Sequence, residues 1–416
     1  MTTRLLSAAV PHGTTDLAHH RAVHGALPVL GRGDADALVD VLTAAGLRGR
    51  GGAGFPAARK LAAVAGSRRP FVVVNGTEGE PASSKDRLLL GRQPHLVLDG
   101  AVTAARVVGA GEVVVVAPAA THDAVARAID DRAARDEPAI RLVAAAEGYV
   151  AGEETAVLAH VEGRPPVPRL APPRPAERGL DGRPTLVQNV ETLAHLALIV
   201  RHGADWFRAV GTPERPGTTL VSVSGAVARR GVHEVPVGVP VDDVLRLAGG
   251  PGEPVRALLV GGYFGAWIDG AARPALTDRD LRPHGASVGA GVVIALGASA
   301  CPVRTVARLA SWMSGQSAGQ CGSCVNGLAA IAGVLVRLAD GDGTPDDLRL
   351  LHRWTAMVDG RGACAHPTGT VRMIASAARL FAVDLEDHAH HGRCAACAGT
   401  GRAAATAHGR AGAVAA

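Results

Sequence analysis

The side chains best suited to holding a ligand begin in a glycine-rich segment, residues 46–56, which reads GLRGRGGAGFP and is followed by Lys60. Glycine lets the backbone approach a ligand closely and turn its N–H groups toward a phosphate. The arginines and Lys60 add positive charge. A flexible linker is the alternative, but linkers seldom alternate glycine with arginine before a helix. The segment therefore predicts a phosphate cradle.

A second segment, residues 74–87 (VNGTEGEPASSKDR), directly follows a predicted strand at 71–74. A doubly wound sheet places its ligand at the carboxyl ends of its strands. Asn75 offers both a donor and an acceptor to a heterocyclic ring, while Glu78 and Glu80 are suited to ribose hydroxyls. The alternative is a solvated loop that ends in a serine helix cap.

Two further segments, residues 148–155 (GYVAGEET) and 184–192 (PTLVQNVET), follow along the chain. The paired glutamates of the first open a predicted helix, where the helix dipole favours negative charge, so plain capping would explain them. The Gln-Asn pair of the second suits a polar ring. The four segments in this order are far more specific than any one alone.

The chain has six cysteines, four of them in two CxxC pairs at 321–324 and 394–397. This usage indicates metal or redox chemistry rather than a secreted disulfide framework. The tail pair and the histidines before it have the ligand types of a zinc site. A zinc finger would need more hydrophobic sequence around it, so completion of a cluster, adventitious metal binding and no role are the alternatives. Cys301 is interpreted as a buried structural cysteine.

The elements that must position these residues alternate in the first half of the chain. Strands are expected at 71–74, 112–117 and 140–145, and helices at 98–108 and 121–135. Apolar runs of this length are typical of a parallel sheet covered on both faces. We therefore expect a doubly wound α/β domain.

The predicted secondary structure of the second half changes after a proline-dense connector at 164–175. Sequence from about residue 218 is β-rich, with one helix at 241–247, and a small β-grasp-like module fits it. Beyond Cys301 helices are expected at 303–314, 322–339, 345–358 and 368–383. Four helices with short connections indicate a bundle. The tail from His388 is expected to be loose, apart from its cysteine pair.

Composition excludes several classes of function. A net charge of +5 over 416 residues is mild and aromatic residues make up only 3%, so a nucleic-acid groove is not expected. Residues 1–27 lack the apolar stretch of a signal peptide. Glycine and proline punctuate the stretch 286–303, which favours a strand and a helix start over a membrane span. We expect a soluble, cytoplasmic protein.

The order and wording of the four segments resemble the NADH-binding flavoprotein subunit of respiratory complex I, a family also found in NAD-linked hydrogenases and formate dehydrogenases. The resemblance runs from about Leu47 to Phe381. It implies an α/β doubly wound FMN-binding domain, a small β-grasp-like (SLBB) domain and a C-terminal four-helix bundle that binds an iron–sulfur cluster. The implied boundaries are 1–45 for an N-terminal extension and first helices, 46–205 for the FMN domain and candidate NADH domain, 206–297 for the SLBB domain, 298–385 for the iron–sulfur domain and 386–416 for a flexible tail.

The resemblance also implies a set of cofactor-binding residues. They are Gly49, Arg50, Gly51, Gly52, Gly54, Phe55, Lys60, Asn75, Glu78, Glu80, Gly152, Glu153, Glu154, Gln188, Asn189 and Thr192. Within this set Phe55 matches an aromatic that contacts the nicotinamide nucleotide, and Glu80 matches a carboxylate that binds the NADH ribose. No residue is assigned as a general acid or base, because hydride transfer needs none here.

The chain departs from the family pattern where the dinucleotide would bind. Arg174 replaces a phenylalanine at the adenine end, Ala171 replaces a lysine, and Ala63 replaces a second stacking aromatic. Each lost ring stack removes about 1 kcal/mol. Arg174 can stack on adenine or contact a phosphate instead, so NADPH is an alternative to NADH. Thr77 for aspartate and Gln188 for asparagine keep polarity, which leaves FMN the favoured cofactor.

The cluster segment departs at one position. Cys321, Cys324 and Cys364 match three of the family's four cluster ligands, while Ala318 stands where the first would be. Iron–sulfur clusters are held by Cys thiolates, usually four. Three thiolates are compatible with a site-differentiated [4Fe–4S], a [3Fe–4S] or no cluster. We expect a cluster, of the [4Fe–4S] type.

Three functions are compatible with these residues. The first is an oxidoreductase subunit that oxidises NADH or NADPH through FMN and passes electrons through the iron–sulfur centre to a protein or quinone-linked acceptor. The second is an FMN protein with a decayed dinucleotide site that shuttles electrons between a ferredoxin-like partner and a reductase. The third is a non-catalytic scaffold. The expected partners are electron-transfer proteins, ferredoxin-like or other subunits of a redox complex, with no nucleic acid and no direct membrane span.

Overall fold

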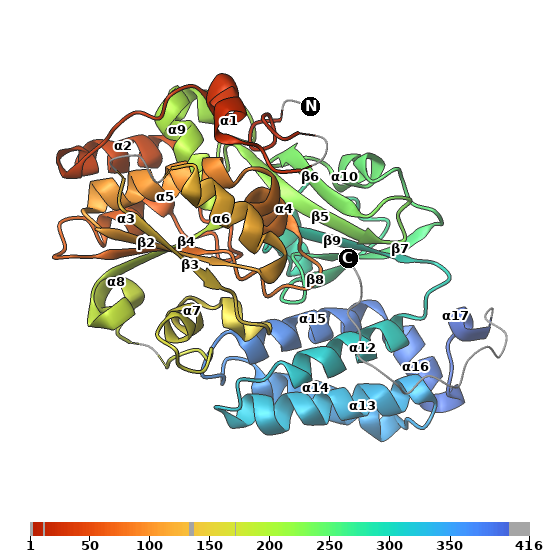
Figure 1. Cartoon of the computed structure of the whole chain (residues 1–416). Helices are drawn as coiled ribbons and strands as arrows, with labels where there is room; N and C mark the ends of the chain where they lie inside the picture. The colour runs from red at the N-terminus through yellow and green to blue at the C-terminus, as the bar shows by residue number, and fades with distance from the viewer. Residues whose placement is uncertain (1–2, 11–12, 133–136, 171, 399–416) are drawn as a thin grey trace. The chain divides into compact units, whose positions relative to one another are not determined.

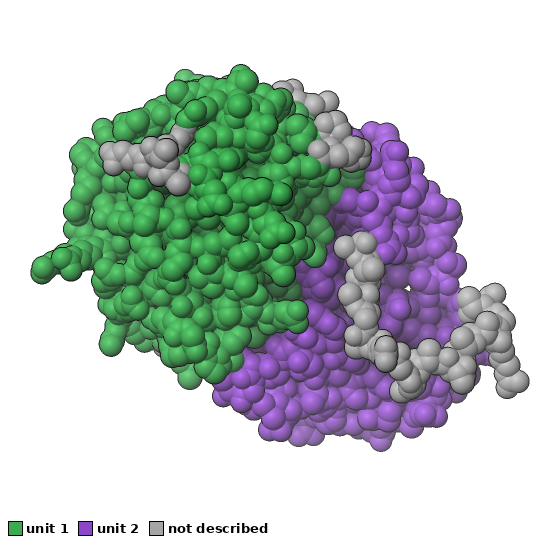
Figure 2. All heavy atoms as spheres, in the orientation of Figure 1, with its two compact units in different colours: residues 1–79, 83–221, 232–239 green, residues 80–82, 222–231, 240–416 purple. Residues whose placement is uncertain are grey.

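The computed structural model describes residues 3–10, 13–132, 137–170 and 172–398. The chain forms two compact units, coloured green and purple in Figure 2. Unit 1 comprises residues 1–79, 83–221 and 232–239, and unit 2 comprises residues 80–82, 222–231 and 240–416.

Unit 1 is built on a four-stranded parallel sheet in the order β3-β2-β1-β4. Figure 1 labels β2, β3 and β4 of this sheet. The strands are β1 (Phe71–Asn75), β2 (Glu112–Ala117), β3 (Ala139–Ala144) and β4 (Thr185–Asn189). The chain moves outward from β1 to β3 and then returns to the other side of β1 as β4. The strand order therefore reverses between β1 and β4, which is the switch point where sheets of this kind bind ligands.

Both faces of this sheet are covered, as the apolar runs predict. On one face Val72 and Val74 of β1 join a core with α2 (Ala35–Ala45), α3 (Ala57–Ala62), α4 (Lys85–Arg92), α5 (Pro94–Val108), α6 (His122–Asp130) and α9 (Val190–Arg208). On the other face Phe71 and Val73 pack with α7 (Glu154–Val161). The smaller helices of the unit are α1 (Leu17–His24), η1 (Arg32–Asp34), η2 (Ala119–Thr121), η3 (Val150–Gly152), α8 (Pro175–Arg178) and η4 (Leu180–Gly182).

The predicted strands of unit 1 are confirmed to within a residue at each end, but two helices differ in length. Helix α5 begins at Pro94 rather than at residue 98, because Pro94 can occupy the first turn without needing its missing N–H. Helix α6 follows its N-cap Thr121 as predicted and ends at Asp130. Residues 133–136, the end of the predicted helix, lie outside the described residues.

A second sheet has the order β6-β5-β9-β7-β8. Its strands are β5 (Thr218–Gly225), β6 (Gly231–Pro236), β7 (Val255–Val260), β8 (Ala266–Asp269) and β9 (Val292–Gly297). Strand β9 pairs with β5 in parallel and with β7 antiparallel. Helix α10 (Val241–Leu247) falls where the sequence predicts it, and α11 (Asp278–Leu281) and η5 (Arg282–His284) precede β9.

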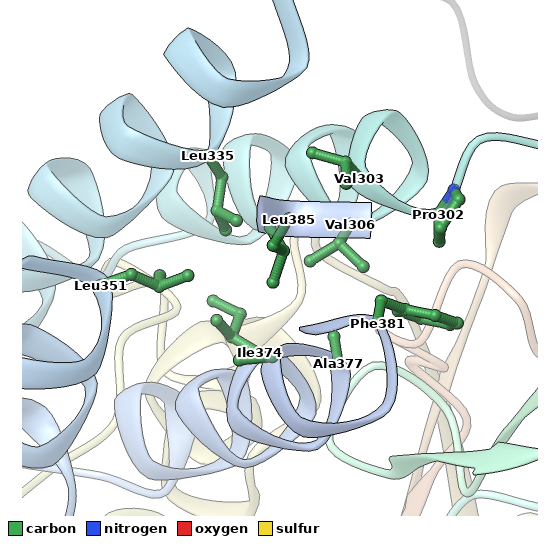
Figure 3. Close-up of a pocket in the computed structure, with 10 residues that line it drawn as sticks. Pro302, Val303, Val306, Leu335, Leu351, Ile374, Ala377, Phe381 and Leu385 are labelled. Atoms are coloured by element: carbon green, nitrogen blue, oxygen red, sulfur yellow. The ribbon is translucent and has the colours of Figure 1, made fainter. Parts of the chain in front are cut away.

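The described part of unit 2 after Cys301 is helical. The elements are α12 (Pro302–Gly315), the π-helical segment η6 (Ser323–Leu328), α13 (Ala329–Asp340), α14 (Pro345–Val358), α15 (His366–Leu380), α16 (Ala382–His391) and α17 (Ala395–Ala398). Figure 3 shows the apolar pocket that α12, α13, α14, α15 and α16 line, with Leu335, Leu351 and Ile374 pointing into it. No polar side chain lines this described pocket, so it belongs to the packing core of the helices.

The tail differs from the prediction of a loose segment after His388. Helix α16 continues to His391 because Leu385 and Ala389 bury one of its faces, each with 7% exposure or less. A short helix, α17, follows it. Residues 399–416 lie outside the described residues.

One stretch of described helix, residues 323–340, is long and apolar enough by composition to cross a membrane, with a mean hydropathy of 1.4. Close to half of it, 44%, is buried, and α13 packs against α12 and α14. A core helix passes the same composition test, and this packing favours a core helix. The predicted strand and helix start at 286–303 are confirmed as β9 and the beginning of α12.

Candidate functional site

Two asparagines mark the switch point of the unit 1 sheet. Asn75 ends β1 and Asn189 ends β4, and the two are register partners on neighbouring parallel strands. The Nδ2 of Asn75 donates to the Gly152 carbonyl oxygen at 2.9 Å, and its Oδ1 accepts from the Thr77 N–H at 3.2 Å. The second and third predicted segments therefore meet at this point.

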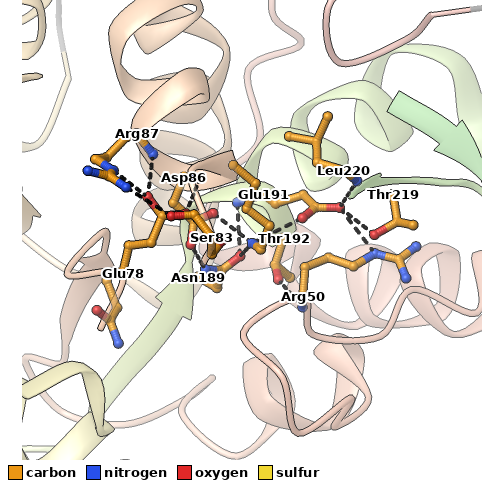
Figure 4. Close-up of polar contacts among 12 residues, drawn as sticks. Arg50, Glu78, Ser83, Asp86, Arg87, Asn189, Glu191, Thr192, Thr219 and Leu220 are labelled. Carbon is orange, nitrogen blue, oxygen red and sulfur yellow. Dashed lines mark hydrogen bonds and ion pairs between the residues drawn. The ribbon is translucent and has the colours of Figure 1, made fainter. Parts of the chain in front are cut away.

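Asn189 is held by a buried charged network that sequence reasoning missed (Figure 4). Its Oδ1 accepts from the Glu191 N–H at 3.0 Å, which caps α9, and its Nδ2 donates to Asp86 Oδ2 at 2.6 Å. The Lys85 Nζ lies 2.8 Å from Asp86 Oδ1 and 3.0 Å from Glu191 Oε2. Burial disfavours the Lys85 charge, but the two carboxylates outweigh it and raise the pKa of Lys85. The sequence signal was the lysine-aspartate pair at the end of the second segment, residues 74–87.

The first glycine segment forms a closed loop next to Asn189. The Gly49 N–H donates to the Phe55 carbonyl oxygen at 2.8 Å, and the Arg50 N–H donates to Thr192 Oγ1 at 2.9 Å. A Cβ placed on Gly51 would lie 3.4 Å from the Cβ of Asn189. The first and fourth segments therefore also meet, with the tip of the loop exposed to solvent.

The side chain of Arg50 is not displayed on this loop, in contrast to the expectation that the loop arginines offer charge to a phosphate. Arg50 is only 7% exposed. Its Nη2 donates to the Thr218 carbonyl oxygen at 3.0 Å, and its Nε lies 3.8 Å from Glu191 Oε1. The guanidinium turns inward because the buried Glu191 carboxylate needs cationic partners. Thr192 is likewise fully buried and serves to anchor the loop.

Lys60 and Glu154 join the first segment to the third. The Lys60 Nζ lies 2.7 Å from Glu154 Oε2 and donates to the Val187 carbonyl oxygen at 2.9 Å. Both side chains remain about one-third exposed, at 32% and 34%. Glu153 instead caps α7, accepting from the N–H groups of Thr155 and Ala156, so the capping alternative holds for this residue. Gln188 is buried within β4.

Glu78 caps a helix in the structure. Its carboxylate accepts from Ser83 Oγ at 2.7 Å, from the Asp86 N–H at 3.0 Å and from the Arg87 N–H at 3.1 Å. The backbone of Glu78 has a φ of 45°, a left-handed conformation that non-glycine residues seldom adopt. The contacts of its carboxylate hold it there. The expected contact of Glu78 with a ribose stays a prediction, and its carboxylate is already occupied.

Glu80 belongs to unit 2 rather than to the unit that holds the other predicted flavin residues. Its carboxylate accepts from the Tyr263 N–H at 2.7 Å and from the Ala82 N–H at 3.2 Å. Burial, together with the Glu80 charge, raises the pKa of the Tyr263 hydroxyl to about 12. The role of Glu80 at an NADH ribose stays a prediction.

The unit 1 residues fit a phosphorylated ligand with a polar ring. Among the described residues, Thr77 Oγ1 is buried without a hydrogen-bond partner, and such groups are uncommon unless a ligand or water completes them. A Cβ on Gly152 would lie 3.5 Å from the Gly79 nitrogen and 3.9 Å from the Thr77 Cβ, so glycine keeps this space open. Phe55 is 40% exposed at the loop, and the Arg59 guanidinium carbon lies 5.6 Å from the centroid of its ring.

The three predicted cluster cysteines gather in unit 2. Cys321 precedes the π-helical segment η6, and Cys324 lies within it, 4% exposed. The Ser323 Oγ donates to the Arg361 carbonyl oxygen at 2.8 Å, which brings this loop to the turn that carries Cys364. Burial, with the nearby charges of Cys321 and Cys364, raises the pKa of the Cys324 thiol to about 12. The thiol donor set fits an iron–sulfur cluster.

Ala318, where the resemblance predicts the remaining cluster cysteine, is half-buried. The neighbouring Ser317 side chain hydrogen-bonds to the Cys324 thiol. This segment therefore adds one hydroxyl, and no further thiol, to the three described cysteines.

The comparisons with known proteins confirm the resemblance that the four segments predict. Residues 42–198 match the model of the Nuo51 FMN-binding domain, and residues 304–388 match that of the NADH-ubiquinone oxidoreductase-F iron-sulfur binding region. The two matches cover the candidate flavin site of unit 1 and the cysteine site of unit 2.

Similarity to individual proteins extends over most of the chain. The NADH-quinone oxidoreductase F subunit 2 of Rhizobium meliloti is 32% identical over 385 residues, covering 88% of this chain and 91% of that protein. The NADH-quinone oxidoreductase F subunit of Streptomyces coelicolor is 33% identical over 381 residues, covering 85% and 83%. The H2-reduced crystal structure of an NAD+-reducing [NiFe]-hydrogenase matches with a TM-score of 0.77 and 33% identity, covering 86% of this chain and 63% of that chain. The air-oxidized hydrogenase structure matches with a TM-score of 0.80 and 31% identity, covering 93% and 67%.

Proposed function

The chain belongs to the family of NADH-quinone oxidoreductase F subunits, and on this premise we propose that it is the flavoprotein subunit that oxidises NADH and passes electrons to partner subunits. The observation that carries the proposal is the pairing of Asn75 with Asn189 at the switch point of the sheet, beside the Gly51 backbone. FMN, when bound, supplies the conversion of a two-electron hydride into single electrons.

The residues of unit 1 have distinct parts in this proposal. The exposed backbone of the loop at 49–55 receives the phosphate. Asn75 and the Thr77 hydroxyl contact the polar edge of the ring system. Lys60 and Glu154, one-third exposed, lie at the rim and orient the ring. Glu78, Glu153 and Thr192 act on the ligand through the backbone that they hold.

The residues of unit 2 carry the onward path for electrons. Cys321, Cys324 and Cys364 hold an iron–sulfur cluster, and the helices from 298 to 385 form a four-helix bundle around it. The sheet between 206 and 297 is a β-grasp-like (SLBB) domain. The flavin domain occupies 46–205, after an N-terminal extension of residues 1–45. The partners are the other subunits of a redox complex, and the location is cytoplasmic.

A specific observation favours a second candidate, an FMN protein that no longer uses a dinucleotide. Arg174 and Ala63, which replace stacking aromatics of the family, are both exposed in the structure. Ala171, the third departure, lies outside the described residues. In this alternative the flavin exchanges electrons between protein partners only.

One experiment tests both candidates. The full-length chain is purified anaerobically, its visible spectrum is recorded, and NADH and NADPH are added separately. The proposal predicts flavin absorption that NADH bleaches within seconds. Bleaching by NADPH alone would reassign the donor through Arg174. Bound flavin that neither nucleotide reduces would support the second candidate, and protein without flavin after incubation with FMN would overturn both.

A further inference from the structure

Four side chains other than the three cluster cysteines converge in unit 2. The Sγ atoms of Cys301, Cys394 and Cys397 and a ring nitrogen of His388 all lie within 4.8 Å of one another. Cys301 immediately precedes α12, His388 lies in α16, and the two remaining cysteines bracket the start of α17. Cys301, interpreted from the sequence as a buried structural cysteine, is half-buried and has three neighbours that can bind a metal.

The distances match the edges of a tetrahedron around one small ion. Zn–S bonds of about 2.3 Å and Zn–N bonds of about 2.0–2.1 Å give tetrahedral edges of about 3.8 Å between sulfurs and about 3.5 Å between sulfur and nitrogen. The Cys394 Sγ lies 3.6 Å from Cys301 Sγ and 3.8 Å from Cys397 Sγ. The His388 Nε2 lies 3.4 Å from Cys301 Sγ and 3.6 Å from Cys397 Sγ.

The ring of His388 is oriented as a ligand. Its Nδ1 lies 2.7 Å from the Leu338 carbonyl oxygen, which can only accept, so Nδ1 carries the proton and donates it. The lone pair of Nε2 is then directed at the three sulfurs, which is the arrangement that metal-bound histidines share. His388 is fully buried, so water does not compete for this position.

Cys301 is also held in place by its own helix. It is the N-cap of α12, and its Sγ accepts from the Arg304 N–H at 3.5 Å. A helix N-terminus stabilises a thiolate, the form in which cysteine binds a metal. The helices α12, α13 and α16 supply the hydrophobic surroundings that the tail sequence lacks.

We propose that Cys301, His388, Cys394 and Cys397 form a structural zinc site. Three thiolates and one imidazole select a soft or borderline cation and disfavour Mg2+ or Ca2+, which prefer oxygen ligands. Four protein ligands leave no open coordination position, which is typical of structural rather than catalytic zinc. The ion ties α16 and α17 to the start of α12 and the end of α13. The proposal does not depend on the proposed function.

The test measures zinc and iron per chain in full-length protein purified anaerobically without chelators. We expect about one zinc per chain. Cys397→Ser and His388→Ala each reduce the zinc content at least severalfold, whereas His390→Ala, a change at an exposed histidine of the same helix, leaves it unchanged. His388→Cys retains zinc, because four cysteines also form a structural site. Far-UV circular dichroism verifies that each variant is folded.

Co2+ added to metal-free protein gives a second readout that does not rely on purification history. We expect the intense visible absorption of tetrahedral thiolate-bound cobalt, lost in Cys397→Ser. Cys321→Ser, which removes a proposed cluster ligand, lowers iron and spares zinc, so failure of the cluster and failure of the zinc site are distinguishable. Zinc unchanged in both Cys397→Ser and His388→Ala, iron in place of zinc at this site, or a disulfide between Cys394 and Cys397 in the native protein would each overturn the proposal.

Discussion

The side-chain amide of Asn75 donates a hydrogen bond to the Gly152 carbonyl oxygen, 2.9 Å away. This single contact joins the end of the central strand β1 to the loop that precedes α7. It fixes the orientation of the Asn75 amide, so that its remaining donor and acceptor capacity is available at the switch point. At the proposed flavin site this side chain is therefore held in one orientation by the backbone of another loop.

Replacing Asn75 tests this arrangement. We expect Asn75→Ala to weaken FMN binding about tenfold, since one or two hydrogen bonds of about 1 kcal/mol each are lost. Quenching of flavin fluorescence on titration of the apoprotein measures the dissociation constant. The control is Glu112→Gln, which removes an exposed ion pair with Arg141 at the amino end of β2. Equal dissociation constants in both variants would contradict the assignment.

A methyl group at Gly51 tests the glycine loop. Its Cβ would lie 3.4 Å from the Cβ of Asn189, a contact that the fold can accommodate, but the methyl group would fill space beside the ligand. We expect Gly51→Ala to raise the FMN dissociation constant about tenfold or more, with the melting temperature nearly unchanged. In Gly111→Ala the added Cβ meets nothing within 4 Å, and FMN binding should match that of the unaltered chain. A stability loss without a loss of affinity in Gly51→Ala would argue for a purely structural loop.

Removing the charge of Glu191 tests the buried network. Its carboxylate is fully buried, lies 3.0 Å from Lys85 Nζ, and accepts from the Leu220 N–H at 3.1 Å. We expect Glu191→Gln to lower the free energy of unfolding by about 3 kcal/mol, because Lys85 and Arg50 lose a shared counter-charge. Urea unfolding, monitored by circular dichroism, measures this change in the free energy of unfolding. A loss as small as that of the exposed Glu112→Gln, about 0.5 kcal/mol, would show that the network is dispensable.

The stability of unit 1 should depend on pH through its buried histidines, among them His24 and His95. Burial lowers the pKa of His24 and of His95 to about 4. The unfolded chain binds those protons at about pH 6.5, so the free energy of unfolding should fall as pH drops from about 6.5 to about 4. Urea midpoints at about pH 7.5 and pH 5 measure the loss. We expect His95→Gln to reduce this loss of stability at low pH. His19→Gln, at an exposed position, should leave the loss unchanged. Identical pH profiles in all three proteins would rule out this origin.

Restoring a thiol at position 318 tests the cluster. We expect Ala318→Cys, after anaerobic reconstitution, to bind about four iron atoms per chain as a [4Fe–4S] cluster. The unaltered chain, with three thiolates, should show the electron paramagnetic resonance signal of a [3Fe–4S] cluster on mild oxidation. Ala209→Cys adds a cysteine at an exposed position of unit 1 and should not change the signal. A full [4Fe–4S] cluster, stable to oxidation, in the unaltered chain would mean that another group supplies the fourth ligand.

The sequence predicts three strands of the unit 1 sheet, because buried parallel strands are short apolar runs bounded by polar residues, and Asn75 was recognisable at the end of one of them. Strand β4 was not predicted, and Asn189 was singled out only as part of a Gln-Asn pair. The inward turn of Arg50 was not recognisable. It depends on Glu191, whose burial follows from packing of α9 and not from any local pattern.

The cysteines of the tail show even more clearly that a contact set by tertiary packing cannot be predicted from local sequence. Cys301 and Cys394 lie far apart in the sequence, and their sulfurs are 3.6 Å apart only because α16 folds back along α12. A CxxC pair gives half of a tetrahedral site, and the other half comes from tertiary structure. Glu78 is a third case, because its capping contacts come with a left-handed backbone that no local sequence pattern indicates.

Because the strand order is β3-β2-β1-β4, the two strands that pair at the switch point are separated in the sequence by β2 and β3 and are synthesised at different times. Strand β1 is synthesised early, yet its neighbour β4 emerges from the ribosome only after β2, β3 and the proline-dense connector. Domains fold largely in the order in which they are synthesised. A nascent chain that stops before Asn189 contains Asn75 but lacks its register partner on β4. A site that uses both asparagines is therefore complete only after β4 has been synthesised.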